Sequence, residues 1–364
     1  MAPFEAAAAR AEQALWPLDQ LRRLALRGLT AGWPFGRALA CRRSLRVSLL
    51  LAFHASAAFV LAVVAPSFLL AVTPLVFGVP HLAADARYLI VRRAWPRWWL
   101  IASAGFAAAL VAVRVADEAG ARFAPAISVE QGIAGAWVLL GAVAGLIASR
   151  GRPRGWLVLM AAAGLAVFAV ATPRAFRMAL LHGHNLLAVV VWLVLFPRGR
   201  RLAWLPVAVI LTGAALLTSG VLIPWTVAHG WLSVAGLHLF AAADWLAPGL
   251  PDQVAVGLAA SFAFLQAVHY LIWLVGIPAA DRPGDGGRSW RAGWRDLVRD
   301  LRPAGVATVV AVTVLVAGSG LLAAAPTRRL FLSIGSFHAW LELAVLALAL
   351  GRGAARPLTG SPPA

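Results

Sequence analysis

Long, uninterrupted apolar runs constrain this chain more than any other feature of its sequence. Several exceed about 18 residues, the length at which an apolar segment indicates a membrane-spanning helix, and they recur along all 364 residues. In lipid the backbone finds no water partners, so a spanning segment must be a helix or a strand of a closed barrel. Barrel strands alternate polar and apolar residues, whereas these runs are continuous. The sequence therefore predicts an all-α, polytopic integral membrane protein.

About ten transmembrane helices are expected. The predicted ranges are 46–65, 67–91, 98–116, 131–149, 155–172, 177–197, 202–224, 253–277, 303–325 and 329–350. Residues 229–247 form a further apolar stretch that is short and interrupted by polar side chains. We expect this stretch to be a re-entrant or broken helical segment that does not fully cross the membrane.

The arginines predict the orientation of the chain. The net charge is +18, every basic residue is arginine, and eight arginines precede residue 47. If the N-terminus is cytoplasmic, the positive-inside rule is satisfied by the Arg-rich loops at 92–97, 150–154 and 198–201. The Arg-rich loop 281–302 is also inside, provided that residues 229–247 do not cross. Because the charge lies in short loops rather than on a basic face of a soluble fold, we expect no nucleic-acid partner.

One transmembrane domain is expected, over residues 44–351. An interfacial or cytoplasmic arm precedes it at 1–43, and a flexible tail follows at 352–364. Within the loop 281–302, apolar residues at helical spacing predict an amphipathic helix on the inner membrane surface. Arginine without lysine, with abundant Ala, Gly and Pro, is typical of a GC-rich bacterial genome, so we expect a bacterial inner membrane. The single cysteine, Cys41, excludes an internal disulfide and a cysteine-based metal site. The oligomeric state is not determined by the sequence.

The histidines are confined to the apolar segments or their edges. The chain has eight, at positions 54, 81, 182, 184, 229, 238, 269 and 338. Ionisable side chains in a membrane are costly and commonly mark a cavity, a partner or a site. Histidine is also the commonest metal ligand, and it binds as the neutral imidazole. A packing role is the simpler interpretation for His54, and an interfacial role beside two tryptophans is the simpler one for His229.

Several histidines have polar companions at helical spacing. His81, Asp85 and Tyr88 share one helix face. The other groups are Gln266 with His269 and Tyr270, His238 with Asp244, and His338 with Glu342, for which packing and function are equally good interpretations. His182 and His184 are two residues apart, so a regular helix cannot direct both at one point.

This combination of residues predicts a metal site. A metal-bound histidine commonly donates its other N–H to a carboxylate, and a carboxylate one helical turn away can accept it. Ligands restricted to nitrogen and oxygen favour non-haem iron, copper or zinc. We expect Fe²⁺ with open positions that activates dioxygen in an apolar chamber.

Two segments resemble a known family. The stretch GVPHLAAD, residues 78–85, resembles the G-x-P-H-G-x-x-D stretch of the Brp/Blh family of membrane β-carotene dioxygenases. The stretch AGLHLFAAADW, residues 235–245, is similar to that family's later histidine segment. Leu82 stands where the family has glycine, and the family's later HxxxH pair does not occur in this chain. The resemblance implies an iron site held by membrane histidines and central cleavage of carotene to retinal, and it carries over to His81, Asp85, His238 and Asp244.

The leading hypothesis is an iron-dependent membrane oxygenase that acts on a carotenoid or another lipid-soluble substrate and on dioxygen. His81, His184, His238 and His269 are the predicted metal ligands, with His184 and His269 chosen from spacing and polarity. The predicted catalytic residues are Asp85, Tyr88, Asp244 and Tyr270: the two carboxylates orient ligands, and the two tyrosines hydrogen-bond bound oxygen or shape the pocket.

Two other classes of function remain open from the sequence. Polar residues within the membrane and a broken segment are also typical of a proton- or ion-coupled transporter. Against a transporter, the chain has no visible matching halves. A membrane assembly factor or sensor would use the histidines only to pack helices, which the clustering of all eight in apolar segments argues against.

Overall fold

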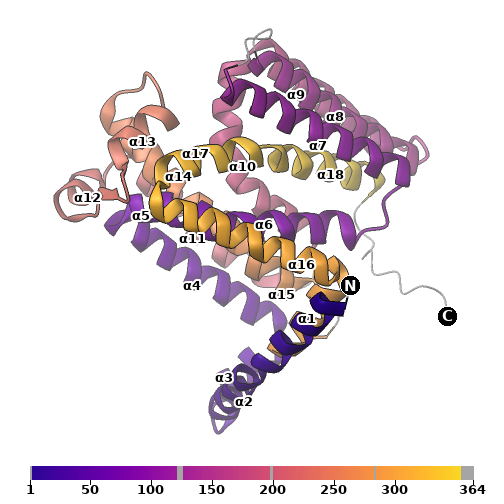
Figure 1. The fold of residues 1–364 in the computed structure, drawn as a ribbon, viewed down its shortest axis with the longest axis vertical. Coiled ribbons are helices and arrows are strands. Elements are labelled where there is room, and N and C mark those ends of the chain that lie inside the picture. The colour runs from indigo at the N-terminus through magenta and orange to yellow at the C-terminus, as the bar shows by residue number, and fades with distance from the viewer. Residues whose placement is uncertain (1, 121–125, 197–199, 283, 354–364) are drawn as a thin grey trace.

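The computed structural model describes residues 2–120, 126–196, 200–282 and 284–353, and these residues are almost entirely helical (Figure 1). Within them, nine helical segments are long and apolar enough to cross a membrane, or ten if the bent pair of α11 (Trp204–Thr218) and α12 (Ile223–His229) counts as one span. The prediction of an all-α polytopic membrane protein is confirmed. The predicted tail at 352–364 lies almost entirely outside the described residues.

Most spans are single helices. They are α4 (Arg43–Val64), α7 (Arg97–Glu118), α8 (Ala126–Ala148), α9 (Pro153–Ala171) and α10 (Pro173–Leu195). A 3-10 turn η3 (Arg200–Leu202) precedes α11, which is long enough to span only together with α12. A further span is the second part of α16 (Trp290–Leu322). Successive spans alternate in direction. The loop after the second span, with Arg92 and Arg93, and the loop between α8 and α9, with Arg152, therefore lie on the side of the bundle where α4 begins.

Three spans are composite, and all three carry candidate site residues. The second span, Pro66–Val91, consists of α5 (Pro66–Val72), η1 (Thr73–Phe77), α6 (Gly78–Asp85) and η2 (Ala86–Val91). The span Asp252–Ala280 consists of α14 (Asp252–Leu271), η4 (Ile272–Gly276) and α15 (Ile277–Ala280). The span Ala324–Arg352 consists of α17 (Ala324–Gly335) and α18 (Phe337–Arg352). The segments η1, η2 and η4 are π-helical, a conformation that is rare and concentrated at functional sites.

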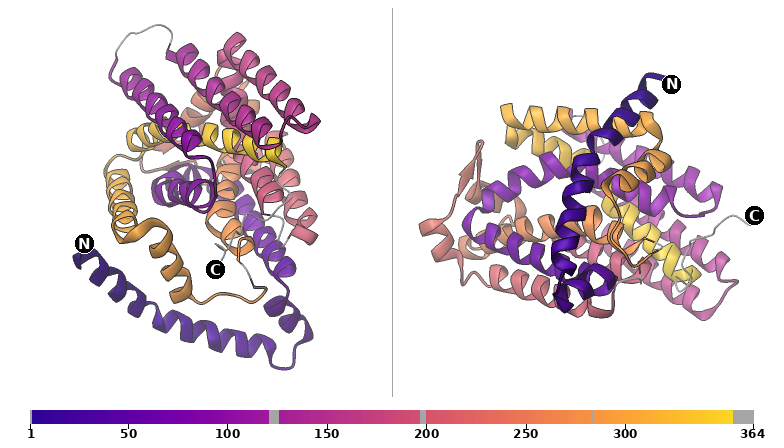
Figure 2. Two further views of the ribbon diagram at one scale, coloured as in Figure 1. Left: turned by 90° about the vertical axis from the view of Figure 1, so that its right-hand side faces the viewer. Right: turned by 90° about the horizontal axis from the view of Figure 1, so that it is seen from below.

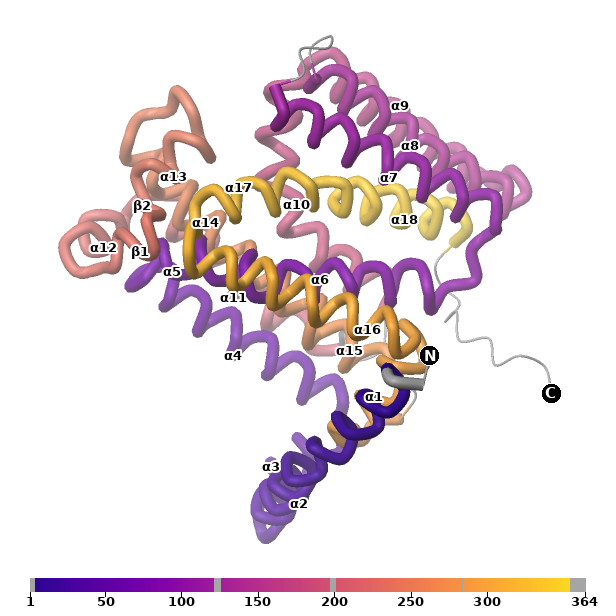
Figure 3. Tube along the Cα trace, in the orientation of Figure 1, coloured from indigo at the N-terminus to yellow at the C-terminus, as the bar shows by residue number. Residues whose placement is uncertain are grey.

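The segment 229–247 does not form a span. It contains the end of α12 (Ile223–His229), a short antiparallel hairpin of β1 (Ser233–Val234) and β2 (Leu237–His238), and α13 (Leu239–Leu246). An eight-residue helix is about 12 Å long, far short of the hydrocarbon thickness. Figure 3 shows α12, the hairpin and α13 together at one end of the bundle, so the expected break in this segment is present.

An N-terminal arm lies at the other end of the bundle. It consists of α1 (Ala2–Ala14), α2 (Trp16–Thr30) and α3 (Pro34–Cys41), and α1 packs against the first part of α16 (Figure 2). Asp19 accepts the backbone N–H of Trp290 at 2.6 Å, and Glu12 contacts Arg291 at 3.2 Å. Helix α16 is broken at Arg302, where φ is 64°, immediately before Pro303. The predicted amphipathic helix is therefore the segment before this break.

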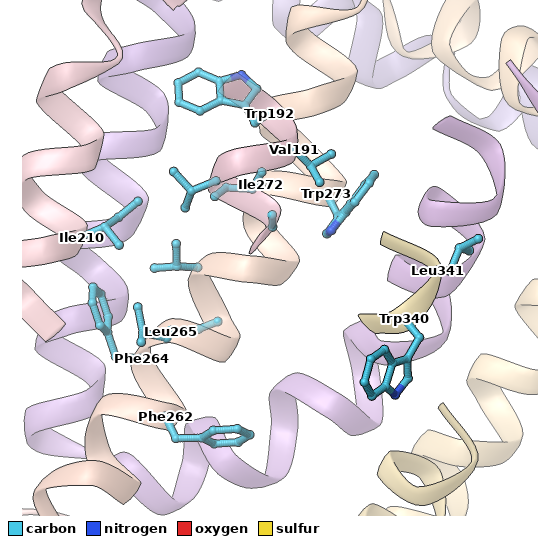
Figure 4. Close-up of a cluster of buried hydrophobic side chains, with 14 of the residues drawn as sticks. Val191, Trp192, Ile210, Phe262, Phe264, Leu265, Ile272, Trp273, Trp340 and Leu341 are labelled. Atoms are coloured by element: carbon cyan, nitrogen blue, oxygen red, sulfur yellow. The ribbon is translucent and has the colours of Figure 1, made fainter. Parts of the chain in front are cut away.

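The buried core is centred on α14, which is the most deeply buried of the spans. Figure 4 shows large apolar side chains from α10, α11, α14, η4 and α18 packed into one cluster around it. The fully buried residues there include Trp192, Phe264, Trp273 and Trp340. The core thus fixes the relative positions of α10, α14 and α18, which each carry one histidine of the site described below.

Small residues allow α8 and α18 to pack closely. Gly141 and Gly145 lie one turn apart on α8 and face Ala344 and Gly351 of α18. A Cβ on Gly145 would lie 2.9 Å from the Cα of Gly351. Helices in lipid associate largely through such close backbone packing, since no hydrophobic effect drives them together. This contact holds α18, and therefore His338 and Glu342, against the bundle.

Replacement of Gly145 by leucine is expected to destabilise the protein by about 1–3 kcal/mol, because the side chain has no space against α18. Thermal unfolding in detergent measures the effect as a lowered midpoint. Gly132→Leu on the same helix is the matched control, because Gly132 has open space around it. Equal midpoints for the two variants would contradict the packing described here.

Candidate metal centre in the membrane core

Four histidines from four helices meet in the interior of the bundle. They are His81 of α6, His184 of α10, His269 of α14 and His338 of α18. The ring centroids of His81 lie 4.8 Å from His269 and 4.7 Å from His338. His184 completes the group, at 5.3 Å from His269 and 5.4 Å from His338. These positions are up to 257 residues apart in the chain, so only tertiary packing joins them.

Backbone contacts select one tautomer for three of these rings. The Nδ1 of His81 lies 3.2 Å from the carbonyl of Gly78, and the Nδ1 of His184 lies 3.2 Å from that of Leu180. The Nδ1 of His338 contacts the carbonyl of Gly335 in the same way. A carbonyl can only accept, so each Nδ1 carries the proton and each Nε2 presents a lone pair. This is the arrangement in which a histidine binds a metal through Nε2 while its other N–H is held.

The Nε2 atoms and one carboxylate converge. The Nε2 of His81 and that of His269 are 2.9 Å apart. One potential ligand atom from each of His81, His269, His338 and Glu342 lies within 4.8 Å of all the others. Two nitrogens at about 2.1 Å from one metal and at a right angle to each other would be about 3.0 Å apart. The spacing therefore fits a shared metal ion.

Two buried carboxylates flank the histidines. Asp85 Oδ2 lies 3.4 Å from His81 Nε2, and Glu342 Oε1 lies 3.5 Å from His269 Nε2. Glu342 Oε1 also accepts a hydrogen bond of 2.9 Å from Trp273 Nε1 of η4. Neither carboxylate has an arginine within ion-pair distance among the described residues. Both side chains are at most 1% exposed, so any charge on them needs compensation inside the protein.

Polar atoms without hydrogen-bond partners gather at this point. Among the described residues, both oxygens of Asp85, the Oε2 of Glu342 and the Nε2 of His338 are buried and make no hydrogen bond. Unsatisfied buried polar groups are rare in folded proteins, because each costs about 1–3 kcal/mol. A divalent cation held by His81, His269, His338 and Glu342 would give His338 and Glu342 a partner and would offset negative charge on the nearby Asp85. The donor set, nitrogen and oxygen without thiolate, suits iron, copper or zinc.

The local structure that presents these residues is irregular. Pro74 and Pro80 lie within the second span, where they interrupt backbone hydrogen bonding. The π-helical segments η1 and η2 flank α6, which carries His81 and Asp85. Likewise η4 follows directly after His269 and contains Trp273. Each extra residue in a π-helical turn rotates the following side chains relative to a regular helix, which allows residues on either side to face one point.

The pair His182 and His184 separates as the two-residue spacing requires. His184 faces the other histidines, whereas His182 Nε2 lies 2.9 Å from the carbonyl of Leu246. His182 thus joins α10 to the end of α13. His54 contacts the carbonyl of Leu50 on its own helix, and His229 stacks on Trp225 at the end of α12, as an interfacial residue would.

The structure does not bring His238 and Asp244 to the four-histidine cluster. His238 caps α13 by accepting the backbone N–H of Phe240, and it is exposed, as is Asp244. The expectation that His238 lies beside His81, His184 and His269 therefore fails, because residues 229–247 form a peripheral hairpin and short helix.

Tyr88 also lies away from the four-histidine cluster: its ring packs on Phe196 and beneath the guanidinium of Arg87. The turn of π-helix η2 after Asp85 rotates Tyr88 off the face that helical spacing predicts.

Tyr270, by contrast, lies at the cluster. Its ring centroid is 4.7 Å from that of His81. His338 and Glu342 take the positions that the sequence analysis gave to His238 and Asp244. Their i, i+4 spacing repeats that of His81 and Asp85, and this repetition was the signal in the sequence that could have assigned them. Trp273 had no such signal, because its contact with Glu342 joins different helices.

A cavity of about 630 Å³ reaches the cluster. His184, His338, Gln266 and Tyr270 line its inner part, together with apolar side chains that include Leu181, Phe262 and Trp340. Its outer part is lined by charged residues at the end of α7, at the starts of α8 and α10, and on α17. A small molecule can therefore approach two of the four histidines from outside the bundle.

No family model, no curated protein and no solved structure matches the chain.

Proposed function

We propose that this protein is a membrane-embedded, metal-dependent oxygenase that acts on a carotenoid or another lipid-soluble substrate. The observation that carries the proposal is the group of His81, His269, His338 and Glu342, which lies within the membrane-spanning bundle beside a cavity with an apolar inner wall. Packing alone would not leave several buried polar atoms of this group without partners.

His81, His269, His338 and Glu342 would hold the metal, with His184 and Asp85 next to it. Bound by nitrogen and oxygen ligands that leave positions open, iron(II) would supply dioxygen chemistry. The protein's own part is to exclude water and to orient the substrate. Leu181, Phe262 and Trp340 form apolar walls, and Tyr270 and Gln266 offer polar groups at the inner end of the cavity.

The bundle fits the inner membrane of a bacterium with its N-terminal arm in the cytoplasm. The arm and the connections on its side carry most of the arginines, as the positive-inside rule requires. Arg87 and Arg92 on this side both pair with Asp300 of α16. The charge therefore also ties the interfacial helix to the second span.

The test is oxygen consumption by the iron-loaded protein in lipid nanodiscs with β-carotene as substrate, followed by product analysis under ¹⁸O₂. The proposal expects carotene-dependent oxygen uptake and labelled cleavage products such as retinal. These should be lost in His338→Ala and retained in His182→Ala. A preparation that stays folded but binds no metal, and that moves protons across liposomes instead, would replace the proposal with a transporter.

Replacement of His238 by alanine is expected to leave metal content unchanged, because this side chain caps α13 away from the four-histidine cluster. Elemental mass spectrometry of the purified variant measures this directly. A loss of metal as complete as that in a His81 variant would place His238 in the metal site and contradict the geometry described here.

A further inference from the structure

The outer part of the cavity carries charges that the proposed metal chemistry does not use. Four arginines line it, Arg114, Arg174, Arg177 and Arg329, against three acids, Asp117, Glu118 and Glu130. They come from the end of α7, the starts of α8 and α10, and α17. We call this outer part the mouth of the cavity. Because successive spans alternate in direction, the mouth lies on the side of the bundle opposite the N-terminal arm.

One pair of these charges is a fixed part of the wall. Arg114 Nη2 donates to Glu130 Oε1 at 2.6 Å, and both side chains are at most 10% exposed. The Nε of Arg114 and the Oε1 of the neighbouring Gln131 are buried and have no hydrogen-bond partner among the described residues. Gln131 is only 1% exposed and lines the cavity. The mouth therefore holds prearranged polar groups with unused hydrogen-bonding capacity.

The remaining three arginines that line this part of the cavity are exposed. Arg174, Arg177 and Arg329 make no ion pair within 4.0 Å with any described residue. Asp117 and Glu118 are exposed at the end of α7, and they attract Arg177 electrostatically without forming an ion pair within 4.0 Å. A second hollow of about 410 Å³ adjoins the cavity, and Arg174 and Ile127 line both. Arg174 thus stands where the two spaces meet.

Between this mouth and the histidines the wall is mostly apolar, with Met178, Leu180, Leu181 and Leu332 among the lining residues. A ligand that fills the whole space must therefore be polar at one end and apolar along its body. Guanidinium groups bind carboxylate and phosphate oxygens through paired, charge-assisted hydrogen bonds.

We propose that the cavity binds an amphiphile with an anionic head group, a carboxylate or a phosphate. The head is held by Arg174, Arg177 and Arg329, and the apolar chain extends to the histidine cluster. This inference rests on the proposed function in one respect, since it defines the substrate class of the same site. Binding itself requires no turnover and is tested without it.

The experiment measures binding of cis-parinaric acid, a long-chain polyene carboxylate, to the protein in nanodiscs of neutral phosphatidylcholine. Energy transfer from tryptophan to the probe reports the bound fraction, since Trp245 and Trp340 line the cavity. Empty nanodiscs give the background from partitioning. Saturable binding of the acid is expected, with the methyl ester about tenfold weaker because it lacks the charge. Acetate and inorganic phosphate at millimolar concentration are expected not to displace the acid, which separates an amphiphile from a free anion.

Variants assign the head-group site. Arg177→Gln and Arg329→Gln should each weaken binding of the acid about tenfold and leave that of the ester within about twofold. Glu118→Gln should change binding in the opposite direction, because it removes a repulsive charge from the mouth. Arg152→Gln is the control: this arginine is exposed and lies at the start of α9, on the other side of the bundle.

Equal binding of acid and ester, or no saturable binding of the acid, would overturn the inference. So would arginine variants that affect both probes alike. Metal content is measured on the same samples and separates the two proposals. Stoichiometric metal without selective acid binding rejects only the amphiphile, whereas selective binding without metal rejects only the oxygenase.

Discussion

Replacement of His269 by alanine is expected to abolish stable metal binding. His269 contacts both a histidine and a carboxylate of the cluster: its Nε2 lies 2.9 Å from that of His81 and 3.5 Å from Glu342 Oε1. Loss of residues that merely support metal ligands commonly costs about 10–100-fold in affinity, so loss of a direct ligand should cost more than about 100-fold. Elemental mass spectrometry after desalting should find the metal of the parent protein missing from the variant.

His182→Ala is the matched control for this experiment. His182 lies two residues from His184 on α10 but contacts the carbonyl of Leu246 instead of the cluster. The variant should keep its metal and lose some stability through the weakened contact between α10 and α13. If His269→Ala retained stoichiometric metal in a folded preparation, the four histidines would serve only to pack the helices together. The oxygenase proposal would then be wrong.

Replacement of Glu342 by glutamine is expected to have opposite effects on the metal-bound and metal-free protein. The amide oxygen can still accept the hydrogen bond from Trp273, so the packing is preserved. The variant cannot ionise at this position, which is fully buried and has no described arginine within ion-pair distance. Without metal, the free energy of unfolding should rise or stay level, because burial of an unpaired charge is costly. With metal, affinity should fall by more than about 100-fold, because Glu342 is a proposed direct ligand and loss of supporting residues alone commonly costs about 10–100-fold.

Thermal unfolding with and without a chelator measures both effects. The parent midpoint should fall on chelation by more than that of the variant, because the parent gains more from the bound ion. Glu130→Gln is the contrasting control. It removes the partner of the buried Arg114, so it should lower the midpoint in both conditions without changing metal content. A metal-free Glu342→Gln protein less stable than its parent would show that Glu342 is needed for packing rather than for a cation.

Part of the site was accessible from spacing within single helices. His81 with Asp85, and His269 with Tyr270, lie close together in sequence, and both pairs are at the cluster. Helical periodicity relates residues up to one or two turns apart, so it could place these pairs on a common face. Helical periodicity placed Tyr88 on the face of His81, and this was wrong. The π-helical segments change the rotation per residue, and nothing in the local sequence marks where they occur.

The choice among the remaining histidines was a question about tertiary structure. His238 and His338 each had a carboxylate nearby in the sequence, and their surroundings are equally apolar. The resemblance to the Brp/Blh family favoured His238 as a metal ligand. In the fold, the packing of α18 on α8 and α10 places His338 in the four-histidine cluster instead. A contact between helices depends on side-chain fit across the whole interface, and a single sequence without its structure does not contain that information in readable form.

The sequence by itself determined that this is a helical membrane protein with about ten spans and a break at 229–247. The cost of exposing backbone and charge to lipid is large and acts on each segment separately, so length, apolarity and arginine placement suffice. Only the tertiary structure decided which histidines meet, how Glu342 and Trp273 join them, and where the charged mouth of the cavity lies. Those features depend on helices far apart in the chain, whose packing is the sum of many small contacts rather than one dominant local cost.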